Sequence, residues 1–401
     1  MIVEASSTFW IGLDDTDERE HGCTTFDFND LVIHLESKGF TISDARLVRL
    51  WPFAPQRTRG NAALSAAVIA AERVDLESAL DDWFTDRFFG LNTGRELHSA
   101  EPALLLTSEQ LPEQMYWDTV KDHVDLADRL IQLESIDHRL WSTHAGRSGV
   151  IGASAAIAWR GEHDCTWECT AWRAKSGPRN VPETIVDKMC KKFPKTILNR
   201  DPNASRSLIA PRTPCPVLYG IRGESRDAVL GGHNFLQENG VEQSIAHRAH
   251  RTNQATDDHL DMMDSGVVLD LEVMQGGHVK INAGKYLLAF AQGGPLNSLA
   301  QSLKLGDEIE WYGLLDNTDT VHLEKLRLSH GKRNSMRPVC DCGSRYKSRG
   351  KHQGLKCPSC GSIEDDIWDF DIQIGDWVEP FASFRRHLSK PLSRMGNPEV
   401  R

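Results

Sequence analysis

The spacing of apolar and polar residues predicts alternating strands and helices in the first part of the chain. Residues 8–13 form a short apolar run typical of a buried strand. Apolar residues between positions 28 and 35 then recur at i, i+3, i+4 and i+7, which predicts a helix that begins at Thr24 and that Gly39 ends.

The same alternation continues along the next hundred residues. Residues 46–51 predict a second strand, and the alanine-rich residues 62–71 predict a tightly packed helix, so a small α/β or α+β sandwich is expected. Residues 117–134 predict an amphipathic helix. A glycine-rich loop at 146–149 then restarts a similar order, which predicts a domain boundary near residue 135.

From residue 266 onward the pattern changes to one typical of strands. Three predicted strands, a helix and two further strands lie at 267–273, 278–282, 285–291, 295–303, 307–314 and 320–328. This is the order of the OB-fold, a five-stranded barrel that often binds nucleic acid. A small barrel with only a packing role is the alternative.

Composition indicates a globular chain with several domains. The sequence has 401 residues, of which 40% are hydrophobic and 26% charged. It has no apolar run of about 18 residues, as a membrane-spanning helix requires. Residues 1–10 contain neither Lys nor Arg, so a signal peptide is not expected and the cytoplasm is the expected compartment.

Charge is unevenly distributed along the chain. The formal net charge is −11, yet residues 332–356 hold eight basic residues and one acid. A second basic group consists of Arg385, Arg386, Lys390 and Arg394. Such segregation fits a local phosphate-binding face on an acidic protein, and a solvated charged tail is an equally good interpretation.

Three carboxylates, Asp14, Asp15 and Asp17, crowd the end of the first predicted strand and follow Gly12. Carboxylates this close repel one another unless a cation neutralises them. Oxygen ligands at the end of a buried strand suit Mg²⁺ and the phosphates of a nucleotide. An ordinary acidic turn is the alternative, and the GxxxxGK[ST] motif of P-loop proteins is absent.

The helix that follows begins with two hydroxyl residues. Gly22 allows close approach of the backbone, and Thr24 and Thr25 stand where free N–H groups attract anions. Carboxylates, glycine and hydroxyls in this order make an ATP·Mg²⁺ site plausible. Thr24 as an ordinary helix cap is the structural alternative.

A second phosphate-binding candidate is a short loop at residues 57–61. Two arginines in a glycine-containing loop before a predicted helix suit phosphate oxygens, although surface arginine pairs are common. The candidate residues are Arg57, Arg59, Gly60 and Asn61.

Four of the nine cysteines predict a zinc site. Cys340 and Cys342 form one pair, Cys357 and Cys360 form the other, and a glycine follows each pair. An odd number of cysteines in a chain without a signal peptide argues against a disulfide framework. Four thiolates leave no open coordination position, so the Zn²⁺ is expected to be structural, with free thiols in a loop as the alternative.

In these motifs and in their order the chain resembles the archaeal tRNA-isoleucine 2-agmatinylcytidine synthetases. The resemblance covers nearly the whole sequence, apart from a departure at 212–216 and a first cysteine pair one residue shorter than the family's CxxC. The matching stretches are IGLDDTD and CTT (11–25), LVRL (47–50), RTRGNAA (57–63), GRSGVIGASAAI (146–157), PVLYGIRGE (216–224), HRTNQATDDHL (250–260), GGHV (276–279), the cysteines and RHLSKPL (386–392).

The resemblance implies a multidomain α+β fold. The domains implied are a kinase-like α/β catalytic domain, a ferredoxin-like domain, an OB-fold barrel, a zinc ribbon and a C-terminal tail. Their expected ranges here are 1–135, 136–260, 261–330, 331–365 and 366–401.

The resemblance also implies a reaction. ATP phosphorylates the C2 carbonyl oxygen of the wobble cytidine of a CAU-anticodon isoleucine tRNA, and agmatine then displaces phosphate, so that AUA is read instead of AUG. Asp14, Asp15 and Asp17 match the carboxylates that hold metal and nucleotide, and Thr24 matches a threonine that becomes phosphorylated. The expected cofactors are ATP, Mg²⁺ and Zn²⁺, the expected partners are tRNA and agmatine, and neither DNA nor a membrane is expected.

Two other functions remain open from the sequence. One is a non-catalytic RNA-binding protein built from the barrel and the ribbon, which leaves the crowded carboxylates beside Thr24 without a role. The other is an ATP-dependent RNA-modifying enzyme that uses a different amine. Consumption of ATP in the presence of tRNA separates the first of these from an enzyme.

Overall fold

The computed structural model describes most of the chain as two compact units. The first unit comprises Met1–Leu260 together with Arg385–Arg401, and the second comprises Asp261–Phe384. The described residues are 7–18, 22–55, 57–58, 60–90, 100–204, 206–366 and 369–396.

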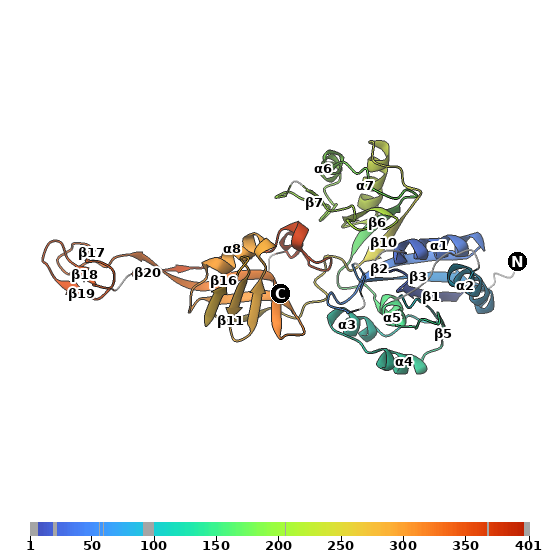
Figure 1. Ribbon diagram of the computed structural model, residues 1–401, viewed down its shortest axis with the longest axis horizontal. Helices are drawn as coiled ribbons and strands as arrows, with labels where there is room; N and C mark the ends of the chain where they lie inside the picture. Colours follow the sequence, from blue (N-terminus) through green and yellow to red (C-terminus); the bar gives the residue numbers. More distant parts are fainter. Residues whose placement is uncertain are drawn as a thin grey trace. The chain divides into compact units, whose positions relative to one another are not determined.

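Within the described residues, eight strands form one continuous sheet in the first unit (Figure 1). Their order is β5-β4-β1-β3-β2-β10-β6-β9, and every pair is antiparallel except the parallel pair of β10 and β2. The strands are β1 (Ser7–Asp14), β2 (Thr41–Arg49), β3 (Ala62–Ala70), β4 (Ala103–Thr107), β5 (His138–Ser142), β6 (Thr166–Trp172), β9 (Val217–Gly223) and β10 (Ala246–Thr252). A separate hairpin joins β7 (Arg200–Asp201) and β8 (Arg206–Ser207).

Helices cover the sheet because alternate strand residues point to opposite faces. In β1, Phe9, Ile11 and Leu13 pack with α1 (Thr24–Ser37) and α2 (Arg73–Phe88), whereas Trp10 packs on the other side. That other side is covered by α3 (Gln114–Lys121), α4 (Leu126–Glu134) and α5 (Val150–Ala158). The helices α6 (Glu183–Lys192) and α7 (Arg226–Glu238) pack on β6 and β9.

Two predicted helices differ from the structure. The alanine-rich stretch predicted as a helix is the central strand β3, whose Leu64, Ala66 and Val68 face α1 and α2. Helices cover β3 on both faces, so apolar residues occupy every position except Ser65 and the period of 2 disappears. The helix predicted over 117–134 is broken into α3 and α4, because the side chain of Asp125 caps α4 by accepting from the Ala127 N–H.

The second unit contains a sheet in the order β11-β15-β16-β14-β13-β12, with α8 packed on it. The predicted succession of strands and one helix is confirmed, except that the strand expected at 267–273 is divided into β11 and β12. The elements are β11 (Asp264–Val267), β12 (Asp270–Val273), β13 (Val279–Asn282), β14 (Tyr286–Ala289), η1 (Ala291–Gly293), α8 (Pro295–Ser302), β15 (Glu308–Leu315) and β16 (Thr320–Met336).

The long strand β16 pairs at its end with β20 (Asp369–Gln373), and the chain between them forms a small cysteine-containing ribbon. The ribbon strands are β17 (Lys347–Ser348), β18 (Leu355–Lys356) and β19 (Ile363–Glu364). Two 3₁₀ turns follow, η2 (Ala382–Phe384) and η3 (Leu392–Arg394). Among the described residues, no helix is long and apolar enough to cross a membrane.

The chain returns from the second unit to the first at residue 385, and we call residues 385–396 the C-terminal strap. Two of its basic residues are paired: Lys390 Nζ lies 2.7 Å from Asp164 Oδ2, and Arg394 Nη2 lies 3.0 Å from Asp164 Oδ1. Both charges therefore have a carboxylate partner within the first unit, and neither belongs to a solvated tail.

Two histidines of the first unit stack where α7 crosses β10. The rings of His233 and His247 lie 3.9 Å apart at 26°. His233 is buried, and its Nδ1 lies 3.0 Å from the Tyr219 hydroxyl. Burial, followed by the neighbouring His247, lowers the pKa of His233 to about 4.

We expect this histidine to make the first unit sensitive to acid. The pKa of His233 is near 6.5 when unfolded and about 4 when folded, so its stabilising contribution is present above pH 6.5 and lost as the pH falls toward 4. Between pH 7.5 and pH 5, the unfolding free energy of the wild-type protein should fall by about 2 kcal/mol more than that of His233→Phe. Chemical denaturation at the two pH values measures this difference. The exposed His144, replaced by Phe, is the control; an equal change in both variants would contradict the assignment.

Candidate active site

A cavity of about 580 Å³ lies in the first unit, where β1 ends and α1 begins. Side chains from distant parts of the sequence line it. We call Asp14, Asp15, Asp17 and Glu101 the acidic group, and Arg49, Glu168 and Arg222 the arginine group.

Backbone geometry brings the acidic group together. Asp14 ends β1 opposite Ala103 of β4, and Asp15 turns the chain with a left-handed φ of 56°. Asp15 Oδ2 accepts a hydrogen bond from the Glu101 N–H at 3.0 Å. Asp17 accepts hydrogen bonds from the hydroxyls of Thr24 (2.9 Å) and Thr58 (3.0 Å).

The surroundings of these carboxylates oppose their ionisation. Burial, and then the charge of Asp15, raises the pKa of Asp14 well above its usual value. Burial, together with the charges of Asp17 and Glu101, raises the pKa of Asp15 to about 7. A divalent cation would remove this repulsion and hold the carboxylates ionised, so the acidic group could bind one.

The start of α1 brings two hydroxyls to the cavity. Thr24, the first residue of α1, and Thr25 both line it, and the Thr25 hydroxyl accepts from Trp172 Nε1 at 3.2 Å. The preceding Cys23 is buried, and burial raises the pKa of its thiol to about 12. Cys23 is thus a neutral packing residue.

The loop between β2 and β3 also reaches the cavity. Arg57, Gly60 and Asn61 line it, whereas Arg59 lies outside the described residues. The loop leads into a strand and not into a helix, so helix N–H groups do not add to an anion site here. Asn61 Nδ2 donates to the Trp51 carbonyl at 2.8 Å and holds the loop, in which Asn61 has a φ of 42°.

Two predicted glycines do not line the cavity among the described residues. Gly12 is buried under α5: a Cβ built there would lie 2.3 Å from the Ala153 carbonyl oxygen, so this glycine permits close helix packing. Gly22 has a φ of 77° and turns the chain toward Cys23 and α1.

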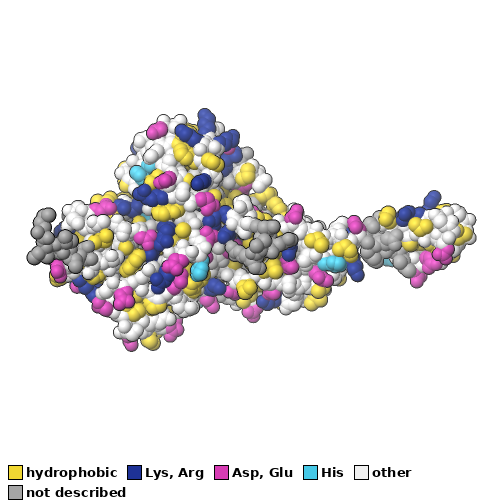
Figure 2. Space-filling model, turned by 180° about the vertical axis from the view of Figure 1, so that it is seen from behind, with side chains coloured by type: hydrophobic (Ala, Val, Ile, Leu, Met, Phe, Trp, Pro, Cys, Tyr) yellow, Lys and Arg dark blue, Asp and Glu magenta, His cyan; other side chains and the backbone are white. Residues whose placement is uncertain are grey.

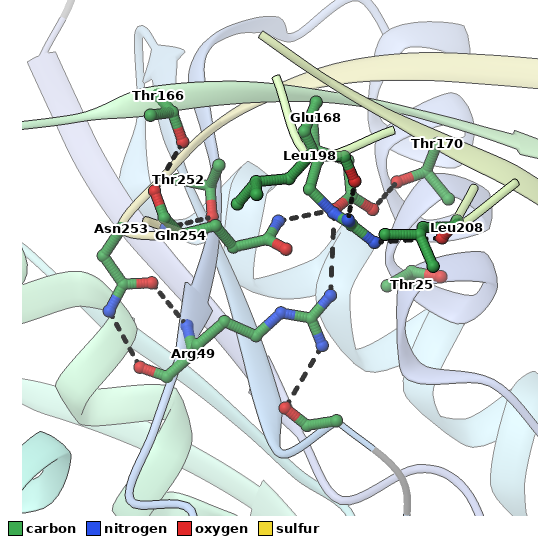
Figure 3. Close-up of polar contacts among 12 residues, drawn as sticks. Thr25, Arg49, Thr166, Glu168, Thr170, Leu198, Leu208, Thr252, Asn253 and Gln254 are labelled. Carbon is green, nitrogen blue, oxygen red and sulfur yellow. Dashed lines mark hydrogen bonds and ion pairs between the residues drawn. The ribbon is translucent and has the colours of Figure 1, made fainter. Parts of the chain in front are cut away.

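The arginine group was not predicted as part of the site. Figure 3 shows Arg49, Thr170 and Gln254 converging on Glu168, which lies on β6. Glu168 Oε2 lies 3.8 Å from both Arg49 Nη2 and Arg222 Nε. Burial alone would raise the pKa of Glu168, but the charges of Arg49 and Arg222 lower it below its usual value, so the carboxylate is ionised and the group carries one net positive charge.

The four ribbon cysteines form a second site. Their sulfur atoms all lie within 4.8 Å of one another, with Cys340 and Cys357 buried and Cys342 and Cys360 exposed. Sulfurs held at about 2.3 Å by one zinc ion lie roughly 3.8 Å apart, so the cluster suits tetrahedral Zn²⁺. The short first pair therefore reaches the same cluster as the second.

Three family models match the chain in sequence order. They are described as the TiaS TCKD domain (residues 10–145), the TiaS FLD domain (147–259) and the TiaS C-terminal zinc ribbon domain (337–372). The tRNA(Ile2) 2-agmatinylcytidine synthetase TiaS of Methanopyrus kandleri is 32% identical, over 95% of this chain and 96% of that protein.

The chain belongs to the tRNA(Ile2) 2-agmatinylcytidine synthetase family. Two solved structures of this family are similar over 97% of this chain and 98% of theirs. The TiaS–tRNA(Ile2)–ATP complex is 27% identical with a TM-score of 0.78. The TiaS–tRNA(Ile2)–AMPCPP–agmatine complex is 26% identical with a TM-score of 0.77.

Gly152 of α5 packs directly against the acidic group. A Cβ at Gly152 would lie 1.9 Å from Asp14 Oδ2, so Gly152→Ala should displace that carboxylate. We expect activity to fall by about 100-fold, because small displacements at a reacting centre are costly. The control is Gly232→Ala in α7, where the new methyl would meet the flexible side chain of Met189 at 3.1 Å. Equal kinetics in both variants would contradict the role of Gly152.

Proposed function

We propose that this protein is an ATP-dependent ligase that joins agmatine to C2 of a cytidine in tRNA(Ile2), at the wobble position of the CAU anticodon. The proposal rests on one observation: in a member of this family, the acidic group and the hydroxyl-bearing start of α1 line one cavity. A protein that only bound RNA would have no need of crowded carboxylates whose ionisation burial opposes.

The acidic group would hold Mg²⁺, which would neutralise the charge of the ATP phosphates. Asp14, Asp15 and Asp17 supply the hard oxygen ligands that Mg²⁺ prefers. As the resemblance implies, Thr24 also receives phosphate, and ATP ends as AMP and two phosphates. The Thr24 hydroxyl already donates to Asp17 at 2.9 Å, and both residues line the cavity.

The chemistry requires positioning and charge stabilisation. The carbonyl oxygen of cytosine is a poor leaving group, and phosphorylation converts it into a good one that an amine can displace. The protein then aligns the reactants and stabilises the charge on the transferred group. The wobble base must leave its stack to reach the cavity, which costs little in a flexible anticodon loop.

The remaining domains hold the RNA. We assign the first unit to a kinase-like and a ferredoxin-like domain, and the second to an OB-fold barrel and a zinc ribbon. Ribbon residues Lys347, Arg349, Lys351 and Lys356 are exposed and suit phosphate contacts. Figure 2 shows basic and acidic side chains mixed on one face of the molecule, which favours local phosphate contacts over one continuous basic surface. As an enzyme acting on tRNA, the protein would work in the cytoplasm.

The deciding experiment is mass spectrometry of the tRNA product. Purified protein is incubated with ATP, Mg²⁺, agmatine and a CAU-anticodon tRNA(Ile2) transcript, and the wobble nucleoside is analysed. We expect an agmatine adduct that requires all four components. Putrescine in place of agmatine tests for another amine, and a transcript with uridine at the wobble position tests the base. An unmodified cytidine together with undiminished ATP would reject the proposal.

A further inference from the structure

The C-terminal strap packs against residues 253–258 of the first unit. The Ala255 N–H donates to the His387 carbonyl at 2.8 Å, and the Asp257 N–H donates to the Leu388 carbonyl at 2.9 Å. Ala255 and Asp257 both have left-handed backbones, with φ of 59° and 67°. Non-glycine residues adopt such conformations at a cost, and the strap fixes them here.

Ion pairs hold the end of the strap in place. Asp164 contacts both Lys390 and Arg394, and Arg394 Nε also lies 2.6 Å from Glu224 Oε1. The Lys390 and Arg394 side chains are 11% and 10% exposed. The two basic side chains are largely buried although their carboxylate partners are partly exposed, so breaking these pairs would leave poorly solvated positive charges.

The strap brings His387 to the cavity wall. A Cβ built at Gly60 would lie 3.5 Å from His387 Nε2, and both residues line the cavity. The charges of Arg49 and Arg222 lower the pKa of His387 well below its usual value, although the residue itself is exposed. The ring is therefore neutral, and one of its nitrogens can accept a hydrogen bond.

Residues 253 and 254 connect the strap to the arginine group. The side-chain amide of Asn253 bonds both backbone groups of Arg49, at 2.7 Å and 2.8 Å. Gln254 donates to Glu168 (Figure 3). A shift of the strap would therefore be transmitted to both Arg49 and Glu168.

The charges beside His387 indicate which substrate binds in this part of the cavity. Agmatine carries two positive charges, and the arginine group carries a net positive charge, so agmatine is repelled from this part of the cavity. Cytosine has an amino group that donates and a ring edge that accepts hydrogen bonds. Arginine donors with a neutral imidazole acceptor match that pattern, whereas uracil presents a carbonyl where cytosine presents its amino group.

We propose that the C-terminal strap completes the nucleobase subsite, in which His387 is a positioning residue that accepts a hydrogen bond from the amino group of the target cytosine. The inference rests on the proposed function. The Asp164–Lys390–Arg394 contacts act on catalysis by holding His387 beside the arginine group.

The test compares His387→Ala and His387→Gln with wild type in the adduct assay. Glutamine retains a neutral acceptor, and alanine removes it. We expect His387→Ala to lower kcat/KM for tRNA by roughly tenfold or more, with the affinity for ATP unchanged within about twofold, and His387→Gln to recover most of the loss. Wild-type kinetics in His387→Ala, or an equal loss in both variants, would overturn the proposal.

Arg394→Met tests the strap without altering the cavity wall. We expect a smaller loss in kcat/KM for tRNA, together with faster hydrogen exchange at the Ala255 and Asp257 amides, which hold the strap. The matched control, Lys188→Met, replaces an exposed lysine of α6 and should change neither. Unchanged hydrogen exchange and unchanged kinetics in Arg394→Met would show that these ion pairs do not hold the strap in place. An absence of adduct with the wild-type protein would instead count against the proposed function, so the two failures are distinguishable.

Discussion

Replacing Asp15 by asparagine is expected to lower the rate of agmatinylcytidine formation by about 10³-fold or more, with little change in tRNA affinity. Asparagine keeps the size of the side chain and tolerates the left-handed φ of 56°, so the turn after β1 should persist. The substitution removes the charge that a cation needs. Single-turnover mass spectrometry over a range of Mg²⁺ concentrations measures the effect.

Asp319→Asn is the matched control for this prediction. Asp319 also has a left-handed backbone, with φ of 57°, and is exposed in the turn between β15 and β16. The control should retain wild-type activity. If Asp15→Asn also turned over normally, the acidic group would not be the site of metal and nucleotide binding.

Replacing Cys357 by serine is expected to release the structural zinc and weaken tRNA binding by at least about tenfold. Cys357 is 1% exposed and, with Cys340, Tyr346 and Leu355, forms the small core of the ribbon. The ribbon has few other apolar contacts, so loss of the metal should unfold it. Its exposed lysines and arginines would then no longer be held in fixed positions. ATP binding should persist, because the cavity is built from the first unit.

Metal content per chain and tRNA binding at fixed salt measure this effect. Cys190→Ser on α6 is the control, since this cysteine lies outside the four-sulfur cluster. Full zinc content in Cys357→Ser would show that the metal does not depend on this ligand. Unchanged tRNA affinity in a zinc-free variant would show that the folded ribbon does not contribute to tRNA binding.

The sequence by itself determined the features whose residues lie close together along the chain. The carboxylates at 14–17 and the threonines at 24 and 25 follow a single strand–helix connection, so local geometry brings them together. The cysteines at 340–360 close a small loop in the same way. The succession of elements in the second unit was also predictable, because its strands have one exposed face and keep an alternating pattern.

Only the tertiary structure decided the features that depend on distant parts of the chain. The alanine-rich sequence of the central strand β3 predicts a helix, because both faces of the strand are buried. It therefore lacks the period of 2 that marks a half-exposed strand. The arginine group joins β2, β6 and β9, and the C-terminal strap adds His387 from the other end of the sequence. The pairing of these strands and the return of the terminal segment cannot be predicted from neighbouring residues. Both are fixed by burial and by ion pairs between residues far apart in sequence.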